Sequence, residues 1–171
     1  MTEPAIKLAD LPKAAPFELH PDDRIAIEHE IAHYDHPRAA VIEALKIVQT
    51  RHGWVPDAAI PAIAGVLRIG SAEVEEVATF YNLIFRQPVG RHVIKLCDSM
   101  SCYLTGYDDV AAAVKRKLGI DFGQTTTDGR FTLLPICCLG ACDKGPVMMI
   151  DDDTHGQLMP HALDDILEAY R

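Results

Sequence analysis

Apolar residues recur every three to four positions over the first half of the chain, and this is the spacing of one face of a helix. The first such stretch begins at Pro21 and places Ile27, Ile31 and Tyr34 on one face. Three further stretches show the same spacing, with apolar positions at Val41, Leu45 and Val48, at Ile60, Ile63, Ala64 and Leu67, and at Val74, Val77, Ala78 and Tyr81. We therefore predict four short amphipathic helices that pack as a small bundle.

After residue 88 the pattern changes, because apolar and polar residues begin to alternate as they do in strands. Strands are predicted at residues 92–97, 131–134, 147–150 and 157–159, with a turn at 151–156. Helical spacing returns at residues 107–118 and 163–170. The order strand, helix, strand, strand, strand, helix predicts a small α/β layer of thioredoxin-like character, in which helices cover a mixed sheet.

This change of pattern divides the chain into parts. Residues 1–16 are rich in Ala, Pro and Lys and show no sustained periodicity, so we expect a flexible N-terminal tail. Residues 17–88 would form the helical bundle, and residues 89–171 would form the α/β domain. The predicted fold class is therefore an α+β chain of two parts.

Composition and charge narrow the possible functions. The chain has 171 residues, of which 49% are hydrophobic and 24% charged, as in folded globular proteins. Its formal net charge of -9, without a basic stripe, disfavours binding to nucleic acid. No apolar run reaches the roughly 20 residues that span a bilayer, and the first residues do not resemble a signal peptide. We expect a cytoplasmic protein without direct membrane insertion.

Four of the five cysteines form two closely spaced pairs. Four residues separate Cys97 from Cys102, three separate Cys138 from Cys142, and Cys137 is the fifth cysteine. In a reducing compartment such pairs are more often metal ligands or redox centres than structural disulfides. Because each pair follows a predicted strand, one edge of the sheet could bring four thiolates to a common point.

The spacing favours an iron–sulfur cluster. Structural zinc sites usually have cysteines only two residues apart, although wider pairs occur. A 2Fe-2S cluster needs two ligands on each iron and backbone N–H groups near sulfur, and Gly140 and Gly145 would let the main chain approach. Zinc, a dithiol redox role and merely buried cysteines remain as alternatives. Adjacent residues of an extended chain point to opposite sides, so either Cys137 or Cys138 must be spare.

The sequence contains no motif that would hold a nucleotide. It has neither a G-x-G-x-x-G turn after a strand nor a P-loop, and we expect no catalytic residue in this chain. The eight histidines are expected to be mostly solvated or capping groups. A protein with one cluster and no substrate pocket transfers single electrons, so any hydride chemistry would belong to a partner with its own cofactor.

Three stretches carry a resemblance to a known family: VATFYNLIFRQPVGRHV, LCDSMSCYLTG and FTLLPICCLGACDKGPVMMID. Over residues 17–171 the chain resembles the small 2Fe-2S subunit, of the 24 kDa type, of bacterial NADH:quinone oxidoreductase (respiratory complex I). The resemblance implies a thioredoxin-like 2Fe-2S ferredoxin domain after the helical bundle. It leaves Cys137 unligated and places the ligands of one 2Fe-2S cluster at Cys97, Cys102, Cys138 and Cys142.

The same resemblance implies a role in a larger assembly. The cluster would exchange single electrons with the FMN of an NADH-binding partner subunit, and the chain would be part of a proton-translocating oxidoreductase at the cytoplasmic face of the inner membrane. The bundle would dock to that partner through aromatic residues near its helix ends: Trp54, Phe80, Tyr81 and Phe85. Two alternatives remain, namely the equivalent diaphorase subunit of an NAD-linked hydrogenase or formate dehydrogenase, and a four-cysteine zinc adaptor without redox activity.

Overall fold

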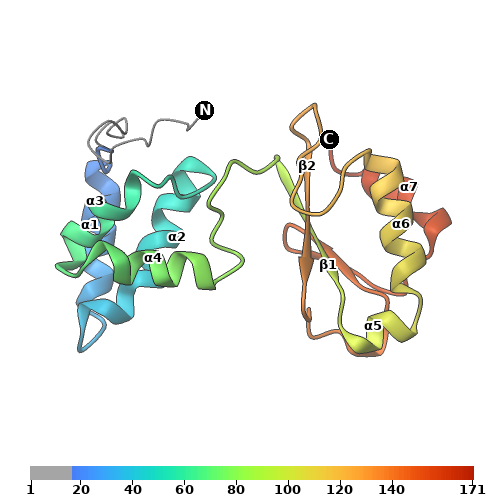
Figure 1. The fold of residues 1–171 in the computed structure, drawn as a ribbon, viewed down its shortest axis with the longest axis horizontal. Helices are drawn as coiled ribbons and strands as arrows, with labels where there is room; N and C mark the ends of the chain where they lie inside the picture. The colour runs from blue at the N-terminus through green and yellow to red at the C-terminus, as the bar shows by residue number, and fades with distance from the viewer. Residues whose placement is uncertain (1–16) are drawn as a thin grey trace, which may run out of the picture. The chain divides into compact units, whose positions relative to one another are not determined.

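The computed structural model describes residues 17–171, and the tail predicted for residues 1–16 lies outside the described residues. The chain divides into two compact units between Pro88 and Val89 (Figure 1). In its described part the first unit is helical, and the second unit contains a four-stranded sheet together with helices.

The helices of the first unit share one hydrophobic core. They are α1 (Pro21–Ile31), the 3-10 turn η2 (Pro37–Ala40), α2 (Val41–His52), α3 (Ala59–Leu67) and α4 (Ser71–Phe80). The core includes one fully buried side chain from each α-helix: Ile27, Leu45, Ile63 and Val74. Burying a side chain of this size contributes roughly 1.5–3 kcal/mol, so this packing stabilises helices that are too short to be stable alone.

Two of the predicted stripes run past the ends of their helices. α1 ends at Ile31, so Tyr34 lies beyond it and is 41% exposed. α4 ends at Phe80, so Tyr81 is likewise outside the helix and 43% exposed. α2 ends at His52 and is capped by Gly53, where its sequence predicts the end, because the φ of 78° at this residue is a left-handed conformation that glycine adopts without strain.

Polar side chains fix neighbouring segments of the first unit to α2. The buried carboxylate of Asp23 in α1 accepts hydrogen bonds from Arg51 Nε at 2.7 and 2.8 Å. The amide of Gln49 accepts from the N–H of Phe85 at 2.6 Å and donates to the carbonyl of Leu83 at 2.9 Å. The segment that follows α4 is therefore held against the end of α2.

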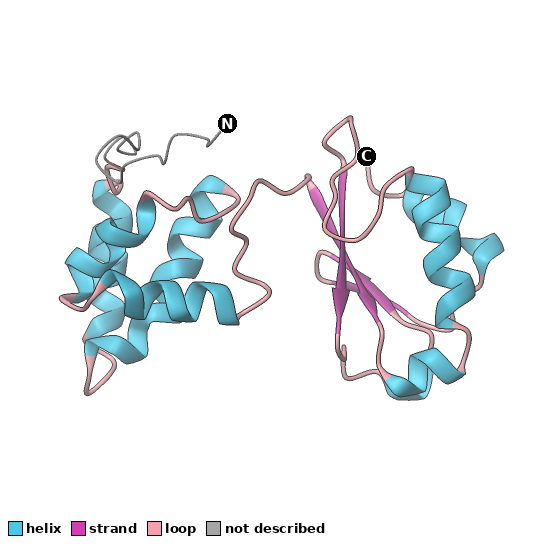
Figure 2. Ribbon diagram, viewed as in Figure 1, coloured by secondary structure: helices cyan, strands magenta, loops and turns pink. Residues whose placement is uncertain are grey.

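The second unit is built on a mixed sheet with strand order β2-β1-β3-β4 (Figure 2). The strands are β1 (His92–Cys97), β2 (Phe131–Ile136), β3 (Met148–Ile150) and β4 (Asp153–His155). β1 pairs with β2 in parallel and with β3 in antiparallel fashion, and β4 pairs antiparallel with β3. The prediction of a mixed sheet is confirmed.

Helices cover one side of this sheet, as Figure 1 shows for the helices labelled α6 and α7. The helical elements are α5 (Met100–Leu104), α6 (Tyr107–Leu118), η3 (Cys142–Lys144), η4 (Pro160–Ala162) and α7 (Leu163–Glu168). Val114 of α6 and Leu163 of α7 belong to one buried cluster with Ile94, Leu133 and Met148 of the strands. Among residues 17–171, no helix combines the length and the apolar character needed to cross a membrane.

The strand predicted at residues 157–159 is wrong. Residues 153–155 pair with β3 instead, after a tight turn in which Asp151 has a φ of 51°. Leu158 is buried, but its N–H donates to the carbonyl of Pro146 at 3.1 Å, outside any strand. The apolar Leu158 is therefore explained by its burial in the core and not by a strand.

Candidate metal centre

The two cysteine-bearing loops leave the same edge of the sheet. β1 and β2 run parallel, and their last residues, Cys97 and Ile136, are register partners. The N–H of Asp98, in the first loop, donates to the carbonyl of Ile136 at 3.0 Å. The expectation that one sheet edge presents both loops is therefore confirmed.

The first loop buries both of its thiols. Cys97 is 2% exposed at the tip of β1, and Cys102 is 1% exposed in α5. The N–H of Tyr103 donates to the carbonyl of Ser99 at 2.8 Å, which closes the helical turn that carries Cys102. Burial raises the pKa of the Cys102 thiol, and the contact with Cys97 raises it further. A bound metal cation would supply the positive charge that stabilises thiolates in this buried position.

The second loop holds two exposed thiols close together. The Sγ atoms of Cys138 and Cys142 lie 3.8 Å apart. Gly140 has a φ of 78°, and its N–H donates to Cys138 Sγ at 3.3 Å. This N–H, together with the Cys142 thiol, lowers the pKa of Cys138, while the Cys138 thiol raises the pKa of Cys142. Cys138 is thus the thiol of the pair that ionises more readily.

The four thiols predicted as ligands form one continuous group. Cys97 contacts Cys102 in the first loop and Cys138 across the two loops, and Cys138 contacts Cys142. The fifth cysteine, Cys137, contacts this group with its backbone carbonyl oxygen, which lies 3.9 Å from Cys97 Sγ. The structure therefore brings together the four positions that the sequence suggested.

Residues in and just before α5 that lie near the thiols could not be identified from the sequence pattern. The hydroxyl of Ser99 faces the thiol of Cys138, and the hydroxyl of Ser101 faces that of Cys142. On the solvent side, Met100, Tyr103 and Leu104 are 71%, 53% and 77% exposed. A helix of five residues is too short to show a hydrophobic period, so the spacing of apolar residues gives no signal for it.

A close contact at a glycine holds the second loop against α5. A Cβ atom at Gly145 would lie 2.7 Å from Thr105 Oγ1 and 3.6 Å from the Cα of Cys102. Any larger residue would have to push this loop away from the helix that carries Cys102. The absence of a side chain at this position therefore helps to bring the two thiol pairs together.

The donor set fits a 2Fe-2S cluster. Thiolates bound tetrahedrally at about 2.3 Å from one metal lie about 3.8 Å apart, and this is the separation of 3.8 Å between the Sγ atoms of Cys138 and Cys142. Each loop supplies one pair of thiols, as two bridged irons require, and the N–H of Gly140 points at the sulfur of Cys138. One zinc ion takes the same four thiolates, so the geometry of the thiols is compatible with either group.

Comparisons with known proteins identify similar chains. A family model described as thioredoxin-like 2Fe-2S ferredoxin matches residues 27–171. The chain is 62% identical over 160 residues to the E subunit of NADH-quinone oxidoreductase from Escherichia coli (strain K12), covering 94% of this chain and 96% of that protein. It is 62% identical over 154 residues to the protein of the same name from Pseudomonas aeruginosa, covering 90% and 93%.

A solved structure is similar in fold. A chain of the NAD+-reducing NiFe-hydrogenase in the H2-reduced state superposes with a TM-score of 0.64 at 20% sequence identity. The match covers 76% of this chain and 22% of that chain. At this identity the likeness extends to the fold alone.

Proposed function

Because the chain belongs to the thioredoxin-like 2Fe-2S ferredoxin family, and within it to the E subunits of NADH-quinone oxidoreductases, we propose that it is an electron-transfer subunit of such an oxidoreductase. The observation that carries the proposal is the convergence of four thiols on one sheet edge in a chain that matches these proteins over 94% of its length.

The proposed ligands of the cluster are the four converging thiols, Cys97, Cys102, Cys138 and Cys142. When bound, a 2Fe-2S cluster accepts and returns one electron at a time. The chain contributes the position and the surroundings of this group. The buried pair keeps water from one side, whereas the exposed pair leaves the other side open to an electron donor or acceptor. The N–H of Gly140 stabilises negative charge on Cys138 sulfur.

In this proposal the hydride chemistry belongs to a partner subunit that holds FMN and NADH, since this chain has no motif for a nucleotide. Support for a partner surface comes from α5, where Met100, Tyr103 and Leu104 expose apolar atoms beside the thiol-bearing loop. Exposed apolar side chains of this kind are typical of contact surfaces. A partner seated on α5 would bring its flavin close to the exposed thiol pair.

The helical unit offers a second contact to the same partner. Phe80 and Leu83, at and after the end of α4, are 79% and 43% exposed. We expect the variant Phe80→Ser/Leu83→Ser to lose co-purification with the flavin-binding subunit, and the control Ile25→Ser, at a residue 64% exposed on α1, to retain it. Undiminished co-purification of the double variant would remove this docking role. The assembled complex would hold the chain at the cytoplasmic face of the inner membrane.

Optical and magnetic spectra of the purified full chain test the cluster itself. A 2Fe-2S protein absorbs visible light, bleaches on reduction and becomes paramagnetic when it takes up one electron. We expect all three properties, with the paramagnetic signal accounting for about one spin per chain. A colourless chain that holds zinc would instead indicate an adaptor without redox activity.

A further inference from the structure

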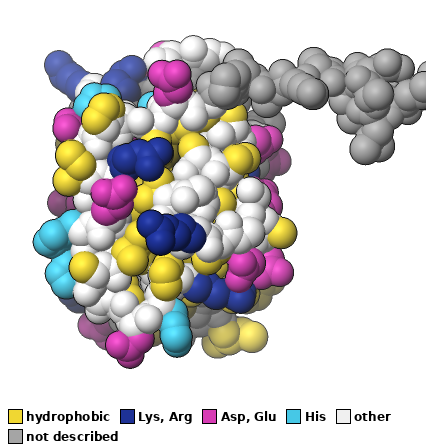
Figure 3. Space-filling view, turned by 90° about the vertical axis from the view of Figure 1, so that its left-hand side faces the viewer, with side chains coloured by type: hydrophobic (Ala, Val, Ile, Leu, Met, Phe, Trp, Pro, Cys, Tyr) yellow, Lys and Arg dark blue, Asp and Glu magenta, His cyan; other side chains and the backbone are white. Residues whose placement is uncertain are grey.

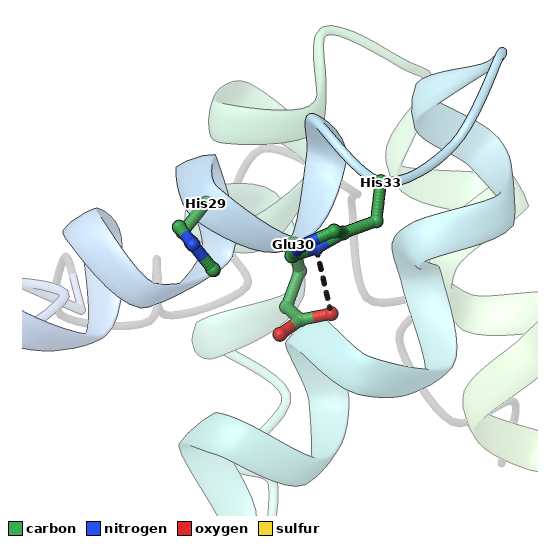
Figure 4. Close-up of side chains that lie close together, drawn as sticks. All are labelled: His29, Glu30 and His33. Carbon is green, nitrogen blue, oxygen red and sulfur yellow. Dashed lines mark ion pairs between the residues drawn. The ribbon is translucent and has the colours of Figure 1, made fainter.

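A second group of side chains that could hold a metal ion lies in the helical unit, at the end of α1. His29, Glu30 and His33 each offer one donor atom, and these three atoms lie within 4.8 Å of one another (Figure 4). The sequence HEIAH at residues 29–33 has the spacing His-Glu-x-x-His, in which two imidazoles about one helical turn apart can bind the same ion. The expectation that the histidines are mostly solvated or capping groups does not account for this spacing.

The backbone at this point places the three side chains on one side. The N–H groups of Ala32 and His33 donate to the carbonyls of His29 and Glu30 at 3.2 and 3.0 Å, so the last turn is tightened after α1 ends at Ile31. The rings of His29 and His33 have centroids 4.7 Å apart, at an interplanar angle of 77°. His33 Nδ1 lies 3.7 Å from Glu30 Oε2, as the dashed line in Figure 4 shows.

These distances are close to those of a metal site. Ligands bound tetrahedrally at about 2.1 Å from one ion lie about 3.4 Å apart, so the donors need to approach one another by no more than about 1.4 Å. The side chains of His33 and Glu30 are 56% and 33% exposed, and His29 is also exposed, so rotation about their side-chain bonds can close this gap. Figure 3 shows histidine side chains at the surface of the helical unit, among charged and hydrophobic ones.

We propose that His29, Glu30 and His33 form a surface site for a divalent transition-metal ion of the zinc type. Two imidazole nitrogens and one carboxylate oxygen would be the protein ligands, and water would occupy the remaining position. Imidazole suits zinc and nickel, whereas magnesium and calcium prefer oxygen ligands throughout. The site is separate from the thiols of the metal centre, and it does not depend on the electron-transfer role.

The charge around the site favours a cation. The C-terminal end of a helix carries partial negative charge, and the three donors lie at the C-terminal end of α1. Asp22 lines a hollow together with His29 and Glu30 and adds a further carboxylate, whose Oδ2 also lies 3.9 Å from Arg51 Nη2. Within the described part of the chain, residues 17–171, no lysine or arginine forms an ion pair with Glu30, so its carboxylate is available to an ion.

Calorimetric titration of the purified full chain with Zn²⁺ tests the proposal. We expect the variants His29→Gln and His33→Gln each to lower the Zn²⁺ affinity of one binding event at least about tenfold. Changes to groups that merely surround a metal's ligands already lower affinity by about this factor. The control His161→Gln, at an exposed histidine of η4, should bind as the wild type does. Zinc held by the cysteine thiols would appear equally in all four proteins, so the difference isolates the site. Unchanged binding in both single variants overturns the proposal.

Thermal unfolding gives a second readout that does not depend on calorimetry. Zn²⁺ should raise the melting temperature of the wild type and of His161→Gln more than that of His29→Gln/His33→Gln, since a ligand of the folded state stabilises that state. Without added metal, the double variant should melt with the wild type because both side chains are exposed. Equal shifts in all proteins, or an equal shift with Mg²⁺ in place of Zn²⁺, would contradict a zinc-type site.

Discussion

Cys137 and Cys138 are adjacent in sequence, yet they meet different surroundings. Cys138 contacts two other thiols and accepts a hydrogen bond from the N–H of Gly140, whereas Cys137 contributes its carbonyl. We predict that Cys138→Ser weakens the binding of the cluster at least about tenfold, as changes at metal sites do, and so lowers the visible absorption of the purified chain. Cys137→Ser should leave the absorption unchanged. Equal losses in the two variants would contradict the assignment of Cys137 as the spare cysteine.

The charge of Asp143 is predicted to tune the electron affinity of the centre. Asp143 is exposed and directly follows Cys142. A carboxylate near a cluster disfavours uptake of an electron, so we expect Asp143→Asn to raise the midpoint potential. The control Asp165→Asn, on α7, should have no such effect. A redox titration followed by the paramagnetic signal measures both, and an unchanged or lowered potential in Asp143→Asn rejects the idea.

The raised pKa of the Tyr170 hydroxyl makes the stability of the fold depend on pH in the alkaline range. Its hydroxyl donates to Asp153 Oδ2 at 2.9 Å and lies 2.8 Å from His155 Nε2. Burial, followed by the carboxylate of Asp153, raises the pKa of Tyr170 to about 12. Because this folded-state pKa lies above the ordinary value of about 10, the stabilisation is complete below about pH 10 and is lost as the pH rises toward 12.

The variant Tyr170→Phe isolates this contribution. We expect it to lower the free energy of unfolding by about 1 kcal/mol near neutral pH, the value of one hydrogen bond. Between about pH 10 and pH 12 the difference in the free energy of unfolding between wild type and variant should shrink, because the wild type loses the hydrogen bond there. Urea unfolding at several pH values measures this, with Tyr103→Phe, at a residue 53% exposed, as the control. A difference that stays constant over this range would be inconsistent with the proposed linkage.

At the scale of the secondary-structure elements, the contact between the end of α5 and the second loop is sensitive to volume. A methyl group at Gly145 would lie 2.7 Å from Thr105 Oγ1, so Gly145→Ala should destabilise the second unit by about 1–3 kcal/mol, as overpacking does, and reduce bound iron. Gly65→Ala in α3 is the matched control, since no atom beyond its immediate chain neighbours and its own helix backbone lies within 4 Å of the added methyl group. Melting curves and iron content measure both, and normal values in Gly145→Ala would show that the loop can yield.

Elements with a hydrophobic period or an apolar run could be predicted from the sequence, whereas α5 and β4, which have neither, could not. The apolar stripe of Val110, Ala111 and Val114 predicts α6, and these residues are buried. β4 lies outside the residues predicted for it because a strand of three residues with an exposed, polar pattern has no periodic signal. The turn before it depends on a positive φ at Asp151, which a non-glycine residue seldom adopts.

For the whole molecule, the candidate site depends on contacts between distant parts of the chain. The hydrophobic period changes at residue 88, and the division of the chain lies between Pro88 and Val89. The four cysteines could be selected from their spacing and from the family resemblance. Their convergence requires residues 92–97 to pair in parallel with residues 131–136, which the sequence suggests only through the two strands that precede the cysteine pairs. The group of His29, Glu30 and His33 differs in this respect. Its spacing is visible in the sequence, but only the distances between its donor atoms in the structure single it out.

The content of iron and acid-labile sulfide in anaerobically purified full-length protein tests the central claim most directly. If four thiols on two loops hold a 2Fe-2S cluster, the preparation should contain about two iron atoms and about two sulfide ions per chain. Protein that holds zinc on these thiols, and contains neither iron nor sulfide, would contradict the assignment of this chain as an electron carrier.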